Sequence, residues 1–212
     1  MAPQPSNVDR VYRHLKHGLL NGDYSLGSRI DAQAIADDLG TSITPVRDAI
    51  QRLVGERLLE PLPHGGFQAP AITAPALLDL YDWNIRLAQV ATQLPPRPNE
   101  PLARLLGAAD SLNNPADLAT ATASLFSHLA HRSGNQAHRH SVAQLNERLH
   151  AARLAEALTL KDAFAEYGRL VNTLDSRRSK TIADRLSAYH QRRKQQIVEI
   201  IGAIHGFHKK QD

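Results

Sequence analysis

The sequence predicts a mainly α-helical protein, in which an N-terminal winged helix-turn-helix is followed by an all-helical bundle. Three observations predict this fold class. Two short helical segments separated by a tight turn fill residues 31–55, and a glycine-bearing hairpin follows at residues 58–72. Beyond this hairpin, apolar residues recur at the spacing of α-helices. We therefore expect two domains, residues 1–73 and residues 74–212.

The first expected helix covers residues 8–21 and ends at Gly22, and a turn-rich connection leads to the next helix. A short helix then spans residues 31–39, where Asp31 can cap the first turn and Gly40 can supply a left-handed residue after the last. The residues expected to face the core from these helices are Val8, Val11, Tyr12, Leu15, Leu19, Leu20, Ala34, Ile35 and Leu39.

The next helix has a proline, Pro45, in its first turn, where the missing N–H group costs no hydrogen bond. We expect Thr41 or Ser42 to cap this helix and Gly55 to end it. Its apolar face carries Val46, Ala49, Ile50 and Leu53, and its outer face carries Ile43, Thr44, Arg47, Asp48 and Gln51.

The polar front of this helix has a use that a core helix lacks. Its free first-turn N–H groups, the helix dipole and Arg47 together predict a phosphate site at the edge of a DNA groove. Gln51 and Thr44 can reach base edges, and Ile43 can touch a thymine methyl group. The alternative is an ordinary helical hairpin with a solvated polar face.

The composition excludes several classes of protein. The 212 residues include no cysteine, which excludes disulfides, thiolate zinc fingers and cysteine nucleophiles and suits a cytoplasmic protein. No apolar run approaches the roughly 18 residues that a membrane span needs, so no membrane partner is expected. Residues 1–73 hold seven Lys/Arg and eight Asp/Glu, whereas residues 177–212 hold nine basic and three acidic residues. Only local charge placement therefore favours DNA binding by the N-terminal domain. We interpret the basic runs at 177–180 and 191–196 as a solvated helix face, with the binding of an acidic ligand or phosphate as the alternative.

The C-terminal part is expected to be helical throughout. A short linker, residues 70–75, leads into a helix that reaches Leu94, where a proline-rich stretch breaks it. Five further helices are predicted, and together the six can enclose a bundle core with a cavity. They cover approximately residues 99–111, 115–132, 136–158, 161–175 and 178–206.

Residues 21–67, NGDYSLGSRIDAQAIADDLGTSITPVRDAIQRLVGERLLEPLPHGGF, resemble the DNA-binding head of GntR-type bacterial transcription regulators. The C-terminal part is similar to the all-helical ligand domain, of the FCD type, in the FadR branch of that family. The segments that carry this second resemblance are YDWNIRLAQVATQL, SGN at residues 133–135, AEYGRLVNTL and ADRLSAYH.

The resemblance implies specific DNA contacts. Arg47 holds the helix arginine of the family, Thr44 the preceding small polar position, and Gln33 a polar position on the first helix of the motif. His64 and Gly65 lie at the wing tip, which in the family reaches the minor groove, although His64 can equally be a solvated loop histidine. Ile43 replaces the usual arginine, so one contact is missing. The complete set of expected DNA-binding residues is Gln33, Ser42, Thr44, Arg47, Gln51, His64 and Gly65.

Many ligand domains of this branch hold a divalent metal with one Asp and three His, and this sequence departs from that pattern. The corresponding positions are Thr122 and Phe126, or Ala123 and Ser127 one residue along, followed by Tyr167 and His190. One imidazole does not hold a metal against water, so we expect no metal and no cofactor. The other histidines of this part, His128, His131, His138 and His140, are interpreted as surface residues, with a zinc site as the alternative.

The resemblance places Arg86, Tyr167 and His190 opposite one another across the bundle. An arginine in an apolar cavity favours a carboxylate, which makes a small organic acid the expected effector. Alternatively, Arg86 extends to solvent or pairs with Asp82, four residues earlier.

Together these features predict a homodimeric transcription regulator, a repressor, that binds a palindromic double-stranded DNA operator under the control of a small carboxylate effector. The dimer is expected because one small head makes too few base contacts for genomic specificity. No enzymatic activity is expected. Two alternatives remain, a small metal-dependent helical enzyme and a DNA-binding protein that responds to no ligand.

Overall fold

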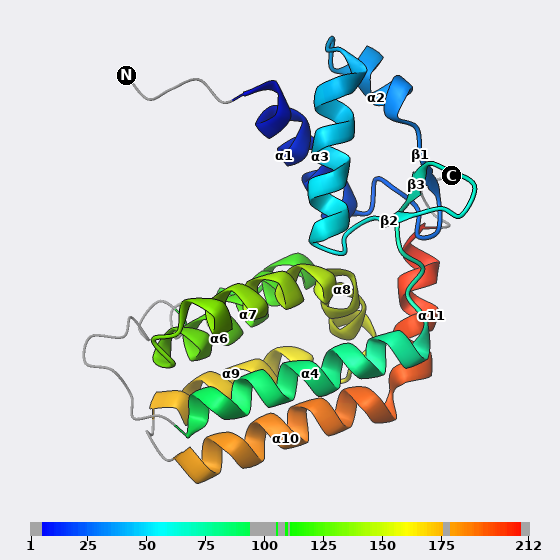
Figure 1. Cartoon of the computed structure of the whole chain (residues 1–212). Helices are drawn as coiled ribbons and strands as arrows, with labels where there is room; N and C mark the ends of the chain where they lie inside the picture. The colour runs from blue at the N-terminus through cyan, green and yellow to red at the C-terminus, as the bar shows by residue number, and fades with distance from the viewer. Residues whose placement is uncertain (1–5, 94–104, 106–108, 110, 176–178, 209–212) are drawn as a thin grey trace. The chain divides into compact units, whose positions relative to one another are not determined.

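The computed structural model describes residues 6–93, 105, 109, 111–175 and 179–208. It divides into two compact units, an N-terminal unit that comprises the chain up to Ile72 together with Phe207 and His208, and a helical unit formed by Thr73–Gly206 (Figure 1). The chain is mainly α-helical, with a small sheet in the N-terminal unit, which confirms the predicted fold class. No helix of the described residues is both long enough and apolar enough to cross a membrane.

The helices of the N-terminal unit are α1 (Asn7–Asn21), α2 (Ala32–Asp38) and α3 (Ile43–Gly55). Both α1 and α2 pack against α3, which carries the centre of the core. The apolar face predicted for α3 is fully buried, whereas its polar face is exposed. Gly22 and Gly40 adopt the left-handed conformation at the ends of the first two helices, as their positions predicted.

One local prediction for this unit is wrong. Ala34 is exposed and Ala36 is buried in its place, because α2 turns Ile35 and Ala36 toward the core. Helix α3 ends at Gly55, as predicted, and the left-handed residue beyond it is Arg57, with φ of 59°. The helix therefore ends after Gly55 in a turn that closes with a hydrogen bond from the Leu58 N–H to the Leu53 carbonyl.

The sheet has three short antiparallel strands in the order β1-β3-β2. The hairpin predicted after α3 is formed by β2 (Glu60–Pro61) and β3 (Phe67–Gln68). Sequence reasoning missed β1 (Arg29–Ile30), which pairs with β3 so that Ile30 lies opposite Phe67. Because β1 exists only through this distant pairing, its sequence looked like part of a turn-rich connection.

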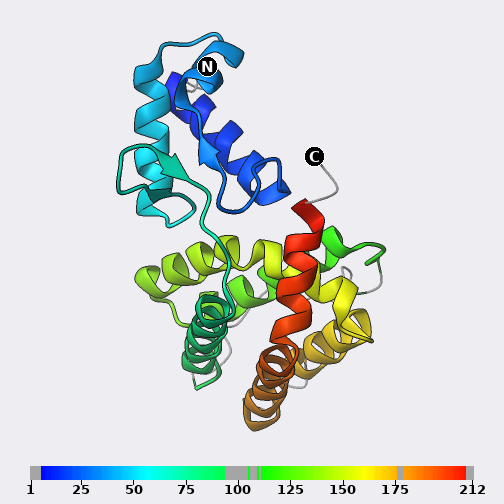
Figure 2. The same ribbon diagram turned by 90° about the vertical axis from the view of Figure 1, so that its right-hand side faces the viewer.

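The helical unit is built around α6 (Pro115–Arg132), which packs against four other helices. These are α4 (Ala74–Thr92), α7 (Gln136–Arg148), α8 (His150–Thr159) and α9 (Ala163–Asp175). A further helix, α10 (Ser179–Gln195), lies along α4 and α9 and is followed by α11 (Ile197–His208) (Figure 2).

Two long predicted helices are each divided in the structure. The helix expected over 136–158 is split at Leu149 into α7 and α8, and the helix expected over 178–206 is interrupted at Gln196 between α10 and α11. The Gln196 N–H is shared between the Arg192 and Arg193 carbonyls, so the interruption is a single distorted turn. Most of the helix predicted over 99–111 lies outside the described residues.

Candidate functional site

An open groove of about 820 Å³ lies on the N-terminal unit, beside the outer face of α3. Three of the predicted DNA-binding residues, Gln33, Arg47 and Gln51, line this groove together. They come from α2 and α3, which the sheet flanks. The remaining lining residues are Arg29, Ile30, Asp31, Ala32, Gly66 and Phe67.

The front end of α3 is open. Ser42 occupies the N-cap position in an extended conformation, with ψ of 162°, but its side chain makes no capping hydrogen bond. Pro45 is the third residue of the helix, as predicted, and it has no N–H to satisfy. The first-turn N–H groups are thus left without a side-chain cap, which suits an anion such as a phosphate. Ser42 and Thr44 are both exposed at this end.

Arg47 and Gln51 are four residues apart on α3, so they lie one turn apart on the same face. Both are exposed, and α3 presents them toward the groove. Gln33 faces the same groove from α2, where its amide donates a hydrogen bond of 2.8 Å to Asp37 Oδ1. A guanidinium and two amides in one groove give the donors and acceptors that base edges and phosphates require.

Arg29 is a groove residue that sequence reasoning missed. Its guanidinium Nη2 donates a hydrogen bond of 3.3 Å to the Gly65 carbonyl at the wing tip. A side chain at Gly66 would meet this guanidinium, because an added Cβ would lie 3.0 Å from the Arg29 Nε. The pairing of β1 with β3 brings Arg29 to the wing. Arg29 could therefore be predicted as a groove residue only if β1 were predicted as well.

Of the wing tip, Gly66 lines the groove, whereas His64 and Gly65 do not. Gly65 and Gly66 have φ of 86° and 92°, which glycine adopts readily and other residues rarely do. His64 precedes them and is exposed. The structure therefore leaves the predicted role of His64 and Gly65 in minor-groove contact as a prediction.

In the helical unit, the prediction for Arg86 is wrong. Arg86 is exposed on α4, whereas Asn84, two residues earlier, is 1% exposed and faces the bundle interior. Two residues correspond to about 200° of rotation around a helix, so the two side chains point in nearly opposite directions. The alternative partner, Asp82, forms an ion pair with Lys194 of α10.

His190 is buried on α10, as the prediction of an inward position required. Its Nδ1 lies 2.7 Å from the Leu186 carbonyl, and its Nε2 lies 2.9 Å from the Asn84 amide. Burial is the main cause that lowers the pKa of His190 to about 3, so the ring is neutral and has a single N–H. Donating that N–H to Leu186 makes Nε2 an acceptor, so the amide nitrogen of Asn84 is the atom that should face it.

Tyr167 is also buried, on α9, and its hydroxyl has no hydrogen-bond partner among the described residues. Burial raises the pKa of Tyr167 to about 12. Of the three residues predicted to hold an effector, the structure therefore buries Tyr167 and His190 and leaves Arg86 exposed.

Comparison with known proteins identifies the N-terminal unit. Residues 7–68 match the bacterial regulatory proteins of the gntR family. The HTH-type transcriptional regulator YdhC of Bacillus subtilis is 32% identical over 85 residues, which are 40% of this chain and 38% of YdhC. McbR of Escherichia coli is 40% identical over 63 residues, 30% of this chain and 28% of McbR. In sequence, the chain thus spans less than two fifths of these curated relatives.

Solved structures extend the likeness in fold to most of the chain. A GntR transcriptional regulator from Rhodococcus sp. RHA1 superposes with a TM-score of 0.76 at 19% identity, covering 92% of this chain and 98% of that one. Escherichia coli McbR superposes with a TM-score of 0.68 at 21% identity, covering 92% and 99%. The predicted GntR-type head is confirmed, whereas the assignment of the helical unit to the FadR branch stays a prediction.

The residues present do not fit the metal site that the FadR-branch resemblance implies. Phe126 packs edge-on against His190, with ring centroids 5.7 Å apart, and offers no ligand. Both nitrogens of His190 are engaged by Leu186 and Asn84. Of the alternative histidines, His138 is engaged elsewhere, since its Nε2 lies 2.9 Å from the Leu87 carbonyl. Across the described residues, no three His, Cys, Asp or Glu side chains are grouped to hold an ion.

A network of buried charges is the main feature of the helical unit that sequence reasoning missed. Arg193 lies in the basic run at 191–196, yet it is 3% exposed, so the interpretation of that run as a solvated face is wrong at this position. Its Nε donates to Glu156 Oε2 at 2.7 Å, and its Nη1 donates to Glu166 Oε2 at 2.8 Å. Glu156 and Glu166 belong to α8 and α9, so their pairing with α10 leaves no local signal in the sequence.

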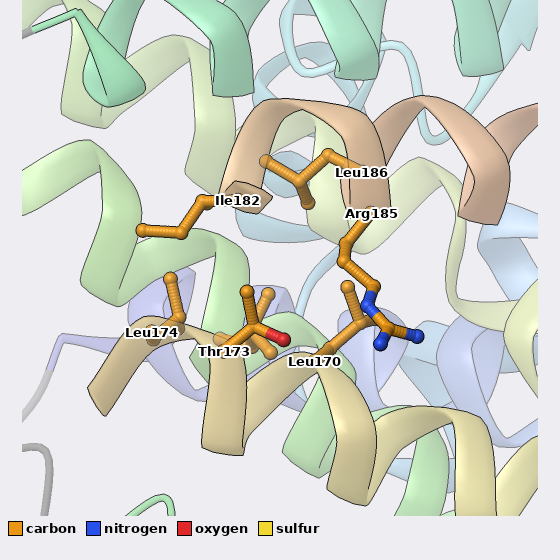
Figure 3. Close-up of a pocket in the computed structure, with 7 residues that line it drawn as sticks. Leu170, Thr173, Leu174, Ile182, Arg185 and Leu186 are labelled. Atoms are coloured by element: carbon orange, nitrogen blue, oxygen red, sulfur yellow. The ribbon is translucent and has the colours of Figure 1, made fainter. Parts of the chain in front are cut away.

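The crevice between α9 and α10 offers no binding site (Figure 3). Leucine and isoleucine side chains from the two helices and α6 meet there, and Arg185 lies at its exposed edge. Its interior has no room even for a water molecule. The apolar side chains fill it, so we assign it to the core.

Proposed function

We propose that this protein is a DNA-binding transcriptional regulator that acts as a homodimer on a palindromic operator, most simply as a repressor. The observation that supports this best is the groove beside α3, where Arg47, Gln51 and Gln33 meet next to an uncapped helix front. The relatives YdhC and McbR are both described as HTH-type transcriptional regulators. The proposal implies a cytoplasmic location, in the compartment that holds the DNA.

The chemistry of the groove indicates how the head would read DNA. The open front of α3 and Arg47 would bind phosphate oxygens at the groove edge and set the register of the helix. Gln51 and Gln33 carry amides, which pair in two directions with the edge of adenine. Arg29 would hold the wing in place through the Gly65 carbonyl, so that the tip can approach the neighbouring minor groove.

The net charge of the head does not favour DNA binding, so the local positions of its basic residues decide whether it binds. Residues 1–73 have eight acidic and seven basic side chains, so the head as a whole does not attract a polyanion. Because one head offers few base contacts, we propose two heads per operator, which gives a palindrome with half-sites about one helical turn apart. The two domains proposed for these roles are residues 1–73 for DNA binding and residues 74–212 for dimerisation and effector binding.

The test of the proposed function is selection of duplexes from a random pool by the full-length protein. Wild type should enrich a short palindrome, and Arg47→Ala should weaken binding to it by on the order of 1–3 kcal/mol per head. Arg86→Ala is the matched control, because it removes the same charge from an exposed position in the helical unit. Wild-type binding by Arg47→Ala would show that the recognition helix is misassigned.

Control by a small organic acid is the second part of the proposal. It is supported by the buried polar side chains of the helical unit, Tyr167 and His190 among them. An effector that binds one arrangement of the heads better than another would change DNA affinity, and DNA would change effector affinity by the same factor. A thermal-shift screen of small carboxylic acids, followed by gel shift with each acid that stabilises the protein, tests this part.

A further inference from the structure

Arg153 of α8 is a buried cation without a carboxylate. Its side chain is 2% exposed, and its guanidinium lies over the Phe126 ring, 5.3 Å from the ring centroid. Nη2 donates a hydrogen bond of 2.9 Å to the Asn146 amide oxygen. Nη1 has no hydrogen-bond partner, and within the described part of the chain no ion pair involves Arg153.

The carboxylates of the neighbourhood are already engaged. Glu156, three residues along the same helix, accepts hydrogen bonds from Tyr81 at 2.6 Å, from Tyr189 at 3.3 Å and from Arg193 at 2.7 Å. Glu166 binds Arg193 at 2.8 Å and Arg192 at 3.5 Å. Glu156 is therefore paired with Arg193, which leaves the charge of Arg153 without an ion-pair partner among the described residues.

A buried guanidinium of this kind is stable only with an anionic partner. The same burial lowers the pKa of Arg153, but an arginine remains charged at neutral pH. The neighbouring His190 is neutral and therefore adds no second positive charge. One buried positive charge, that of Arg153, is therefore left without a partner, and a ligand with a single negative charge would neutralise it.

Other unsatisfied polar atoms lie around the same aromatic ring. His190 packs against Phe126 at 5.7 Å, and Asn84 is hydrogen-bonded to His190. One polar atom of the buried Asn84 amide has no partner. Phe126 thus has the Arg153 guanidinium on one contact and the His190–Asn84 pair on another. With the amide nitrogen turned to His190, the unused Asn84 atom is its oxygen, an acceptor, so the unused donor beside this ring is Nη1 of Arg153.

We propose that the helical unit binds a small monocarboxylate, with the Arg153 guanidinium as its anchor. This inference rests on the proposed function, in which such a ligand controls DNA binding, and it assigns the anion-binding role expected of Arg86 to Arg153. A charge-assisted N–H···O bond from Nη1 satisfies the donor and the charge together. A phosphate dianion fits less well, because only one positive charge is uncompensated.

The test is thermal denaturation of the full-length protein in sodium acetate, compared with sodium chloride of equal ionic strength and with acetamide. Acetamide has nearly the shape of acetate and no charge. Acetate should raise Tm with saturation, by about 4 °C or more when acetate greatly exceeds Kd, whereas acetamide and chloride should not. An acetate effect no larger than the chloride effect would overturn the proposal.

Two variants locate the site. Arg153→Met removes the charge and keeps much of the volume, so it should abolish the acetate response, whereas Arg86→Met should retain it. Retention by Arg153→Met, or loss in Arg86→Met, would overturn the assignment. If Arg153→Met does not fold, Arg153→Gln replaces it and should likewise abolish the acetate response, with a retained response counting against the site.

Failure of this inference is distinguishable from failure of the proposed function. Duplex selection by the same protein without acetate reports on DNA binding alone. If the protein enriches a palindrome but shows no acetate response, the Arg153 site is refuted and the proposed regulatory function stands. A protein that responds to acetate through Arg153 and enriches no duplex supports the site and refutes the regulator.

Discussion

The Tyr81 hydroxyl donates a hydrogen bond of 2.6 Å to Glu156 Oε1 and so joins α4 to α8 inside the helical unit. Both residues are buried, and burial together with the charge of Glu156 raises the pKa of Tyr81 well above its ordinary value. Tyr167 is equally buried, but its hydroxyl has no partner in the described structure. The unit therefore contains a satisfied and an unsatisfied buried tyrosine, which makes a matched comparison.

Replacing each tyrosine by phenylalanine should have opposite effects on stability. Tyr81→Phe removes a hydrogen bond to a charged acceptor and should lower the free energy of unfolding by about 1.5–3 kcal/mol. Tyr167→Phe removes a hydroxyl that gains nothing from its burial, and should raise the free energy of unfolding by up to about 1 kcal/mol. Urea denaturation of both variants measures the difference, and equal destabilisation would contradict this description of the two hydroxyls.

His190 should make stability fall in weak acid. Its folded pKa is about 3, whereas an unfolded imidazole has a pKa of about 6.5, so on acidification the unfolded chain takes up a proton that the folded chain does not. The stabilisation is present above pH 6.5 and is lost progressively as pH falls toward 3, by about 1.4 kcal/mol at pH 5.5.

The variant His190→Gln isolates this effect. It should lose overall stability, but its free energy of unfolding should change less between pH 7.5 and pH 5.5 than that of wild type, by about 1.4 kcal/mol. Burial also lowers the pKa of His150, and that contribution remains in both proteins and cancels in the comparison. The same pH dependence in the two proteins would mean that His190 is protonated in the folded state.

Gly18 of α1 should not tolerate a side chain. A Cβ added there would lie 2.6 Å from the Tyr24 ring, which packs against the core of the N-terminal unit. Gly18→Ala should therefore destabilise the protein by about 1–3 kcal/mol through overpacking, despite the better helix propensity of alanine.

Gly168→Ala provides the control for that prediction. Gly168 is a helical glycine of α9, and an added Cβ there would meet no atom within 4 Å. This substitution should stabilise the protein by about 0.5–1 kcal/mol. Thermal melts of the two variants should move in opposite directions, and a stabilised Gly18→Ala protein would show that Tyr24 is free to move away.

Helix α3 was predictable because its signals are local. Gly40 ends one helix and Pro45 occupies the first turn of the next, and both act through the conformation of their own backbone. The strand β1 was not predictable in this way. Its two residues form a strand only by pairing with β3, nearly forty residues along the chain, and Arg29 reaches the wing through that pairing.

The site in the helical unit was predicted less well, for two physical reasons. The first is the rotational position of residues around α4. Arg86 was predicted to face the bundle interior, but Asn84, two residues earlier, occupies that position. The second is that a charged residue can be buried when its partner comes from another helix. Arg193 and Glu156 compensate each other across α10 and α8, and no spacing in the sequence records that contact.

The most direct test of the central claim is DNA cleavage from the front of α3. The chain has no cysteine, so Thr44→Cys introduces a single thiol, at an exposed position in the first helical turn, that can carry an iron–EDTA group. On the selected palindrome, the labelled protein should cut both strands within each half-site, and the cysteine-free parent treated identically should cut nowhere. A labelled protein that binds the duplex but leaves both half-sites uncut would contradict the placement of α3 in the major groove.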